Sequence, residues 1–503
     1  MKLIQHSDDR SKQDLDDEPS RIEWELLARE ESLESVREEK EKLQKIRARI
    51  NVLEGQLGGK KEERPSLRTS LGTIFAWRNY SVYLTTSWVF TAFSYMGLFF
   101  NLYLVELGWQ YWLIGIVLSI NSAIAATSRL IGGYVGDVSN RKHLSVIAMF
   151  MMAAYNLIMG FFTGFSWIII ALLFYSTMDI FKSGSTAFIM DNIPKEHSGL
   201  GISLFTAGRF FGIVTLGVFA LLDQSSNYLQ DSLQPMFRIG GIFLVGAAIA
   251  RAVLLEGKAP DSKREGVSFI RAFVQENKRA ANLLFKAVPG MIVIVVLDAL
   301  SDSLFNFGAY IYIFEEVGIQ IPGLTLMSIV TILVSVPLLL GTGMLSDRRG
   351  EKTTTLIIYS LMPVCAILLF IAPIYPYLIP ESMVLQIDSL FPSLGSLFST
   401  AFLAIVLKSV NDSVWYLLLL TIIQKNLPGK DTAKILSVFW FIVWLLSSVG
   451  PSIGGFVFEY FYQGYLFIII LLINFVILGW IATRGVIRTK EIPETEDNGE
   501  NNE

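Results

Sequence analysis

Charged side chains fall inside several long apolar stretches of this 503-residue chain, and seven of them are the candidates that we select for chemistry there. A charge at the centre of a bilayer costs about 2.5–3.5 kcal/mol for Asp, Lys or Arg, so it must face a partner or a polar cavity. In such a cavity, carboxylates can carry protons and cations can hold an anionic solute. The seven are Asp179, Lys182, Arg209, Asp298, Asp302, Lys408 and Asp412.

Two of these carboxylates have a spacing that favours proton binding. Asp298 and Asp302 are four residues apart, so a helix places both on one face, and Asn306 continues the same polar stripe. Desolvation and a neighbouring like charge both favour the protonated form of a carboxylic acid. We therefore expect Asp302 or Asp298 to bind and release a proton.

The other charges allow two interpretations. Lys408 and Asp412 are also four residues apart, and they could form an ion pair that only holds helices together, as could Asp179 with Lys182. Alternatively, all four line the substrate and proton pathway. Arg209 either binds an anionic substrate or neutralises Asp179.

The elements that must position these residues are membrane-spanning helices. Apolar residues make up 52% of the chain and charged residues only 17%, where a soluble domain has about a quarter charged. Runs of about 20 apolar residues match the hydrocarbon thickness of a bilayer. The sequence predicts twelve such helices, near 80–105, 112–136, 144–163, 166–190, 198–222, 237–255, 288–314, 323–346, 354–373, 398–424, 433–457 and 464–483.

The charge of the connecting loops orients these helices. Lys and Arg gather in alternate loops, whereas the intervening loops contain Arg238 and almost no other basic residue. By the positive-inside rule the basic loops and both termini are cytoplasmic. The polar, acidic N-terminus is not a cleaved signal peptide. We expect an integral protein of the plasma membrane.

The chain outside the apolar helices also has a clear organisation. We expect a disordered N-terminus (1–20), a charged cytosolic helix (21–60), a first six-helix half (75–255), a basic cytoplasmic linker (256–287), a second half (288–486) and a disordered acidic tail (487–503). Apolar residues repeat every seven within 36–57, so the charged helix is either solvated or a coiled coil that pairs two copies. The linker favours an amphipathic helix on the inner leaflet.

Two short strings reveal an internal repeat. GYVGDVSNRK begins at Gly133 after the second predicted helix, and GMLSDRRGEK begins at Gly343 after the eighth, 210 residues later. A second pair, Asn-Ile-Pro at 192–194 and Asn-Leu-Pro at 426–428, lies two helices further on in each half. The repeat indicates two pseudo-symmetric halves of six helices each, in parallel orientation.

These strings resemble the signature of the major facilitator superfamily, G-x-x-x-D-R-x-G-R-[RK], between helices two and three. The first copy matches at Gly133, Asp137, Arg141 and Lys142 and departs at Val138 and Asn140. The second keeps Gly343, Asp347, Arg348, Gly350 and Lys352 and has Glu351 in place of an Arg. The resemblance covers roughly residues 70–488.

The resemblance implies roles for these residues. In the family the cluster latches the cytoplasmic side in the outward-open state, and an acidic residue on helix four joins it. Here the latch would comprise Gly133, Asp137, Arg141, Asp191, Gly343, Asp347 and Arg348. Helices one, four, seven and ten would line a central cavity, to which helix one offers Tyr95 and Asn101.

A further string bears on the direction of transport. G-P-x-x-G-G is associated with exporters of the family when it lies in helix five, whereas here GPSIGG (450–455) lies in helix eleven. Close helix packing with a kink is the better explanation of the string, so export is favoured only slightly.

The sequence thus predicts an all-α secondary transporter that moves a small solute by alternating access, coupled to protons. Uncoupled facilitation is an alternative, and so is a transporter-like receptor or scaffold that acts through the N-terminal coil. An integral-membrane enzyme lacks support, because there is no histidine cluster, nucleophile motif or phosphate loop. The predicted partners are a small-molecule substrate, protons, the lipid bilayer and a second copy of the chain. We expect no cofactor, metal or nucleic acid; the one cysteine, Cys365, excludes an intrachain disulfide.

Overall fold

The computed structural model describes residues 67–182, 204–205, 207–223, 228–257, 269–287, 289–349, 351–426 and 432–484. By its contacts the chain divides into two compact units, Met1–Thr73 and Ile74–Glu503. The predicted helix over 21–60 and the predicted disordered ends, 1–20 and 487–503, lie outside the described residues. The coiled coil therefore stays a prediction.

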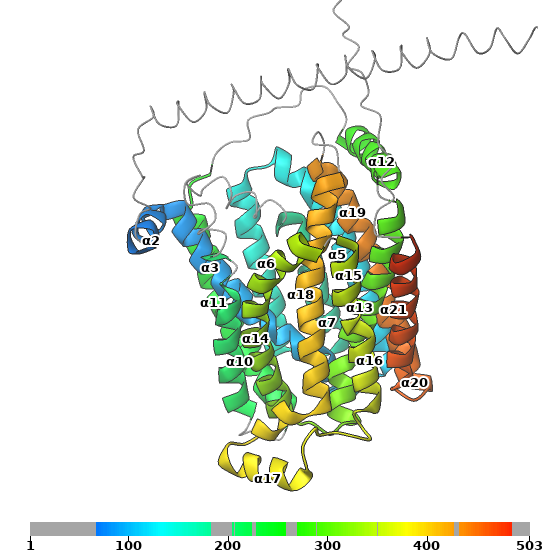
Figure 1. The fold of residues 1–503 in the computed structure, drawn as a ribbon. Coiled ribbons are helices and arrows are strands. Elements are labelled where there is room, and N and C mark those ends of the chain that lie inside the picture. The colour runs from blue at the N-terminus through cyan, green and yellow to red at the C-terminus, as the bar shows by residue number, and fades with distance from the viewer. Residues whose placement is uncertain are drawn as a thin grey trace, which may run out of the picture. The chain divides into compact units, whose positions relative to one another are not determined.

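The second unit is a bundle of helices (Figure 1). Helix α2 (Leu67–Ala76) begins in the first unit and ends in the second. The first half contains α3 (Arg78–Ser94), η1 (Tyr95–Phe99), α4 (Phe100–Glu106), α5 (Tyr111–Val138), α6 (Arg141–Phe161), α7 (Phe165–Thr177), α10 (Arg209–Asp223) and α11 (Leu229–Leu254). The linker and second half contain α12 (Phe269–Ala287), α13 (Pro289–Glu315), α14 (Ile321–Arg349), α15 (Glu351–Tyr359), α16 (Leu361–Ile371), α17 (Glu381–Leu390), η3 (Leu394–Phe398), α18 (Thr400–Asn426), α19 (Thr432–Ser447), α20 (Gly450–Tyr460) and α21 (Tyr465–Arg484).

A described helix overlaps each of the twelve apolar ranges that the sequence predicts. Among the described residues, 8 helices are long and apolar enough to cross a bilayer, and two shorter apolar helices cover Ile321–Ser335 and Thr355–Ile371. Several predicted spans are built from more than one element, since η1 separates α3 from α4 and a short break separates α19 from α20. The all-helical membrane architecture is thus confirmed, and the number of crossings stays a prediction.

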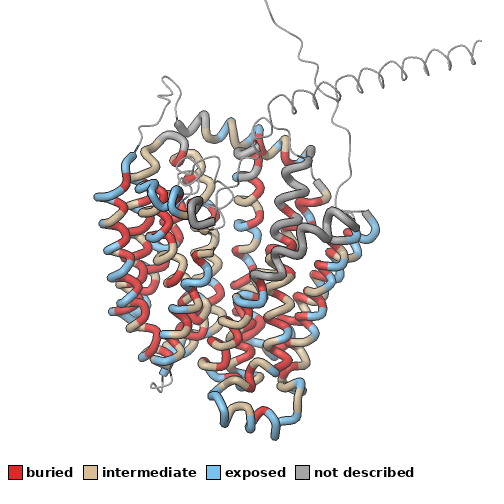
Figure 2. Tube along the Cα trace, turned by 60° about the vertical axis from the view of Figure 1, so that its left-hand side comes forward, coloured by how far each residue is buried: buried red, intermediate tan, exposed pale blue. Residues whose placement is uncertain are grey.

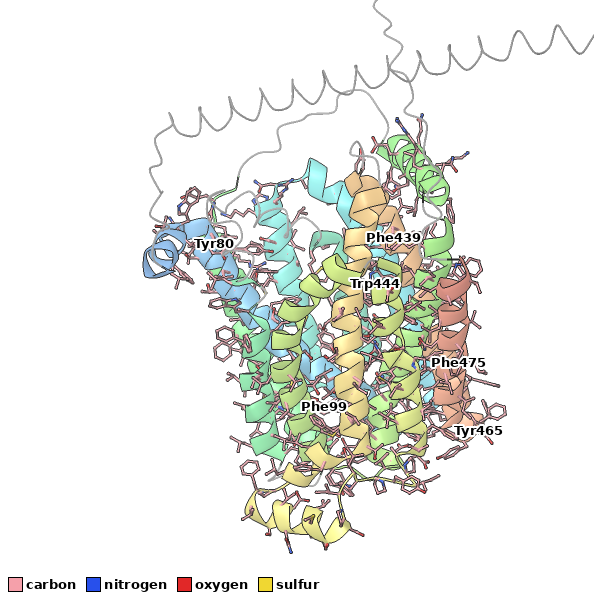
Figure 3. The ribbon with its side chains drawn as sticks, viewed as in Figure 1. Tyr80, Phe99, Phe439, Trp444, Tyr465 and Phe475 are labelled. Carbon is pink, nitrogen blue, oxygen red and sulfur yellow. The ribbon has the colours of Figure 1, made fainter. Side chains whose placement is uncertain are left out.

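The outer surface of the bundle is apolar over much of its length. Large hydrophobic side chains such as Leu221, Val253 and Phe475 remain more than half exposed, and exposed stretches follow the outside of the helices in Figure 2. Figure 3 shows Phe475 on the outside of α21. A soluble protein does not leave so much apolar surface in contact with water. These side chains are therefore placed to meet lipid.

The GPSIGG glycines let three helices approach closely. A Cβ added at Gly115 of α5 would lie 2.3 Å from the Pro451 carbonyl oxygen, and one at Gly455 would lie 2.3 Å from the Tyr111 carbonyl oxygen. At Gly454, a Cβ would lie 2.5 Å from the Phe307 ring of α13. The string therefore packs α20 against α5 and α13, which supports the packing interpretation.

The repeat extends to a turn that the sequence analysis did not single out. Residues 106–110 read Glu-Leu-Gly-Trp-Gln, and residues 316–320 read Glu-Val-Gly-Ile-Gln, again 210 residues apart. Gly108 and Gly318 have backbone φ angles of 79° and 81°, the left-handed region that favours glycine. Each glycine reverses the chain between two helices at the same place in its half.

Helices α12 and α17 mark opposite ends of the bundle (Figure 1), which we call the α12 end and the α17 end. Helix α12 is amphipathic, as the sequence predicts for the linker. Its Ala280 and Leu284 are buried in a cluster with residues of α13 and α19, and Phe273 meets the Tyr134 ring of α5 edge-on at 6.0 Å. One side of α12 therefore packs on helices of both halves, rather than only on lipid.

Candidate substrate and proton site

A cavity of about 270 Å³ lies between the two halves of the bundle. The first half contributes η1 and the start of α10, and the second half contributes α13, α14 and α18. Two of the four helices that the family resemblance assigns to the cavity, seven and ten, supply much of the lining. The lining residues are Tyr95, Leu98, Arg209, Phe305, Asn306, Tyr310, Ser328, Thr331, Ile332, Ser335, Ile405, Lys408, Ser409, Asp412 and Ser413.

Three charged side chains form a cluster, of which Lys408 and Asp412 line this cavity and Asp302 lies behind them. The Lys408 ammonium lies 2.9 Å from Asp302 Oδ1 and also pairs with Asp412 one helical turn away. The Lys408 side chain is 5% exposed, whereas those of Asp302 and Asp412 are 31% and 40% exposed. One buried cation thus serves two accessible carboxylates, one from α13 and one from α18. We call these three residues the charge triad.

Asp298 lies close behind the triad, forms no ion pair with Lys408 and, like Asp302, does not line the cavity. It is 6% exposed, and it accepts hydrogen bonds from the Tyr359 hydroxyl at 2.8 Å and from Trp415 Nε1 at 2.7 Å. Both donors are neutral, and each carboxylate oxygen has one of them. Of the two carboxylates expected to carry a proton, Asp302 pairs with Lys408, which lines the cavity. Asp298 instead makes a contact that joins α13, α15 and α18.

The wall around the triad is polar on one side and aromatic on the other. Tyr310 and Ser328 are joined through their hydroxyls at 2.8 Å, and Ser335 and Ser409 at 2.7 Å, so each pair ties neighbouring helices together. The Lys408 ammonium lies 5.2 Å from the centre of the Phe305 ring. Asn306 is exposed to the cavity, as its position on the predicted polar stripe implies.

The first half supplies Arg209 and Tyr95 to the opposite wall. Arg209 is exposed and begins α10, inside the predicted span 198–222. No carboxylate among the described residues pairs with it. Tyr95 lies against α10 one turn further on, where a Cβ at Gly212 would come within 2.2 Å of its ring. The absence of a side chain at Gly212 therefore lets Tyr95 and Arg209 share this wall.

Asp179 pairs with an arginine that the sequence analysis did not select. Arg129 Nε of α5 donates to Asp179 Oδ2 at 2.6 Å, and the Arg129 guanidinium lies 4.2 Å from the Trp444 ring of α19 (Trp444 is labelled in Figure 3). The expected partners were Lys182 and Arg209. The ammonium of Lys182 instead lies 4.7 Å from the centre of the Phe90 ring. The carboxylate is thus held by helix two.

A second overlooked cation, Arg251, is 4% exposed near the α12 end of α11. It donates to the hydroxyls of Thr86 and Ser87, each at 2.8 Å, and to the Ser145 carbonyl at 3.2 Å. Its guanidinium also lies 4.2 Å from the Tyr83 ring. These contacts join α3, α6 and α11, so Arg251 has a structural role within the first half.

The predicted latch falls largely on residues whose side chains are not described. Asp191 lies outside the described residues, and of Asp137, Gly343, Asp347 and Arg348 only the helical backbone is described. Arg141 begins α6, where the Asn140 side chain accepts from the Lys142 amide at 3.0 Å. A Cβ at Gly133 would lie 3.7 Å from Ser437 Oγ, an ordinary contact. Close approach therefore does not require glycine at 133 in this conformation.

Polar contacts join the halves at the α17 end. The Tyr111 hydroxyl of α5 donates to the Glu315 carboxylate of α13 at 2.7 Å, and the Tyr111 amide donates to Glu459 Oε2 at 2.9 Å. Gln463 Nε2 donates to the same Glu315 at 2.7 Å. Asn101 adds a bond to the Phe307 carbonyl at 3.0 Å. Alternating access would have to break these contacts when that end opens.

With this geometry in place, comparison with known families gives a clear result. The profile described as Major Facilitator Superfamily matches residues 30–217 and 82–413. The chain belongs to this family. The resemblance drawn from the two repeated strings is thereby confirmed, and the protein is a membrane transporter rather than an enzyme.

Solved structures share the fold at low sequence identity. The nucleoside transporter NupG is 14% identical with a TM-score of 0.59, over 82% of this chain and 99% of NupG. A D-xylose–proton symporter is 16% identical with a TM-score of 0.56, over 83% and 99%. A POT family transporter in complex with 5-aminolevulinic acid is 13% identical with a TM-score of 0.59, over 80% and 95%. A search of curated proteins finds no match.

Proposed function

We propose that this protein couples the movement of a small solute to protons through the charge triad, by alternating access of twelve helices in two halves. The proposal rests on one observation, which is that Lys408 lies between Asp302 and Asp412 at the wall of a cavity that both halves line. A structural ion pair would need one carboxylate. The second carboxylate leaves a charge of −1 when all three groups are ionised, and one proton neutralises it.

The triad's charge of −1 is costly because the membrane interior has a low dielectric constant. An unbalanced charge at membrane depth costs several kcal/mol, so the change between inward-open and outward-open states should favour the neutral, protonated triad whenever no other cation of the cavity offsets its charge. Because the two carboxylates compete for one ammonium, the proton belongs to the pair rather than to either residue. Asp412 lines the cavity and its side chain is 40% exposed, so a proton can reach the pair from the cavity through Asp412.

The orientation of the cycle follows from the basic loops. We propose that the α12 end, the termini and the latch strings are cytoplasmic and that the α17 end faces the cell exterior. The Tyr111–Glu315 contacts would then close the exterior side. The GPSIGG glycines carry packing contacts, so the expectation of export that rested on them is not retained.

Uncoupled facilitation and a receptor acting through the N-terminal helix are the competing functions. A facilitator has no need for the second carboxylate of the triad. Among the family's solved structures a D-xylose–proton symporter and a nucleoside transporter have the same fold, which supports a small polar solute without naming it. A receptor would lose its activity when residues 1–65 are deleted, whereas a transporter should retain solute movement.

The test begins with finding a solute by thermal stabilisation of the detergent-purified protein. Bound ligand raises stability by mass action, so a panel of uridine, a dipeptide, xylose, benzoate and benzylamine can be ranked. The best solute is then assayed in proteoliposomes with an imposed pH gradient. We expect the gradient to drive uptake above the equilibrium level in the wild type and not in Asp412→Asn. Equal gradient-driven uptake by both proteins would contradict the proposal.

A further inference from the structure

We infer that the solute is a small organic anion whose negative group binds Arg209 and whose binding draws one proton into the charge triad. This inference rests on the proposed function and adds the substrate class to it. It begins with the cation that has no carboxylate partner among the described residues. Arg209 lines the cavity, is exposed to it and begins α10, which adds the positive end of the helix dipole to the same wall.

The second cation of the cavity is not available to a solute. Lys408 is 5% exposed and is already occupied by Asp302 and Asp412. A solute anion therefore has one accessible cationic contact, the guanidinium of Arg209, which can hold a carboxylate through two parallel hydrogen bonds. A solute cation would meet only carboxylates that already share an ammonium. The arrangement therefore favours an anion over a cation.

The remaining lining suits a compact solute with an apolar body. Tyr95 and Leu98 stand beside Arg209, and Phe305 and Ile405 belong to the opposite helices. The exposed amide of Asn306 offers one donor and one acceptor. A cavity of about 270 Å³ is large enough for a single substituted ring and small for a drug-sized molecule. We therefore expect a monocarboxylate with one ring or a short apolar chain.

The charge balance of the cavity explains why the proton would accompany the anion. The ionisable side chains of the described residues at the cavity and triad are Arg209, Lys408, Asp302 and Asp412, with the phenols Tyr95 and Tyr310. Asp298, Tyr359 and Cys365 lie close behind the triad, and Asp298 is held there by the two neutral donors Tyr359 and Trp415. When ionised, Arg209, Lys408, Asp302 and Asp412 sum to zero, so these four groups leave the empty cavity neutral. An anion on Arg209 leaves the triad's charge of −1 unbalanced, and one proton restores neutrality. Anion and proton thus favour each other's binding.

The first experiment compares ligands of equal size and different charge. Benzoate, benzamide and benzylamine are titrated against detergent-purified wild type, Arg209→Gln and Arg209→Lys, and thermal stabilisation gives an apparent Kd. We expect benzoate to stabilise the wild type more than its neutral and cationic analogues. Loss of the guanidinium in Arg209→Gln should weaken benzoate about tenfold to a hundredfold, and Arg209→Lys should recover part of this. Matching melting temperatures without ligand show that the variants are folded.

Several outcomes would overturn the inference. These are a preference for benzylamine or benzamide, unchanged benzoate binding in Arg209→Gln, or no stabilisation by benzoate at tens of millimolar. If a neutral or cationic solute still shows gradient-driven uptake in the wild type, the substrate class fails while proton coupling stands.

The second experiment counts protons. Calorimetric titration of benzoate in two buffers of different ionisation enthalpy measures the protons taken up on binding, and we expect a value approaching one near neutral pH. In Asp412→Asn the value should fall toward zero while benzoate still binds Arg209. Binding without proton uptake in the wild type would support the anion site and contradict the triad's role, so the two failures are distinguishable.

Discussion

A methyl group added at Gly115 tests whether the close contact between α5 and α20 holds the two halves together. In Gly115→Ala the new Cβ would lie 2.3 Å from the Pro451 carbonyl oxygen and 3.2 Å from the Gly455 Cα. The first distance is too short, because Cβ atoms in real structures essentially never come within 3.0 Å of another heavy atom. These neighbours are backbone atoms and cannot rotate away. The helices must therefore separate, and overpacking of this kind costs about 1–3 kcal/mol.

A matched control separates packing from helix propensity. Gly246 lies within α11 and has no atom within 4 Å of an added Cβ, so Gly246→Ala should stabilise the protein by about 0.4–1 kcal/mol through the unfolded state. Both variants are melted in the same detergent, and the accessibility of an engineered cysteine at Asn306 reports which end is open. We expect a lower melting temperature and faster labelling from the α17 side for Gly115→Ala only. A Gly115→Ala protein as stable as the control would refute the packing argument.

Three further substitutions probe the charges. Lys408→Met leaves Asp302 and Asp412 without the cation that they share, so its melting temperature should fall below that of Lys408→Arg, which keeps the positive charge; equal melting temperatures of the two variants would argue against the triad. Arg129→Met strands the buried Asp179 carboxylate and should lower stability by about 1–3 kcal/mol, with Arg129→Lys closer to wild type in denaturant titrations; equal stability of the two variants would show the pair to be dispensable. Tyr111→Phe removes a bond between the halves, worth about 1 kcal/mol at this exposed site, and should speed labelling of Asn306→Cys from the α17 side without changing its labelling from the α12 side.

The helices follow closely from the sequence because apolar length is a local property. A run of about 20 apolar residues specifies a spanning helix wherever it occurs, so each predicted range overlaps a described helix. The pair of Lys408 and Asp412 was equally predictable, since four residues along a helix bring side chains together. The interruptions within the predicted spans were not predicted from the sequence. The start of α10 at Arg209 and the turn η1 depend on packing, as the contact between Gly212 and Tyr95 shows.

The site beyond these local pairs depends on contacts between distant segments. Asp302 of α13 pairs with Lys408 of α18. Asp298 of α13 accepts hydrogen bonds from Tyr359 of α15 and Trp415 of α18. Both sets of contacts depend on how these helices pack. Helical spacing put both carboxylates on one face and could not say which one pairs with Lys408. Arg129 could have been found, because it lies within the predicted span 112–136 and the cost of a charge there demands a partner.

The most direct test of proton coupling compares three single substitutions in pH-sensitive, dye-loaded proteoliposomes supplied with the solute that best stabilises the wild type. Asp302→Asn or Asp412→Asn leaves the triad neutral when ionised, so we predict solute exchange without solute-driven proton flux in either variant. Asp298 accepts from Tyr359 and Trp415 rather than pairing with Lys408, so Asp298→Asn should keep proton flux in proportion to the folded protein recovered by size exclusion. Solute-driven proton flux that persists in both Asp302→Asn and Asp412→Asn would contradict the role of the charge triad.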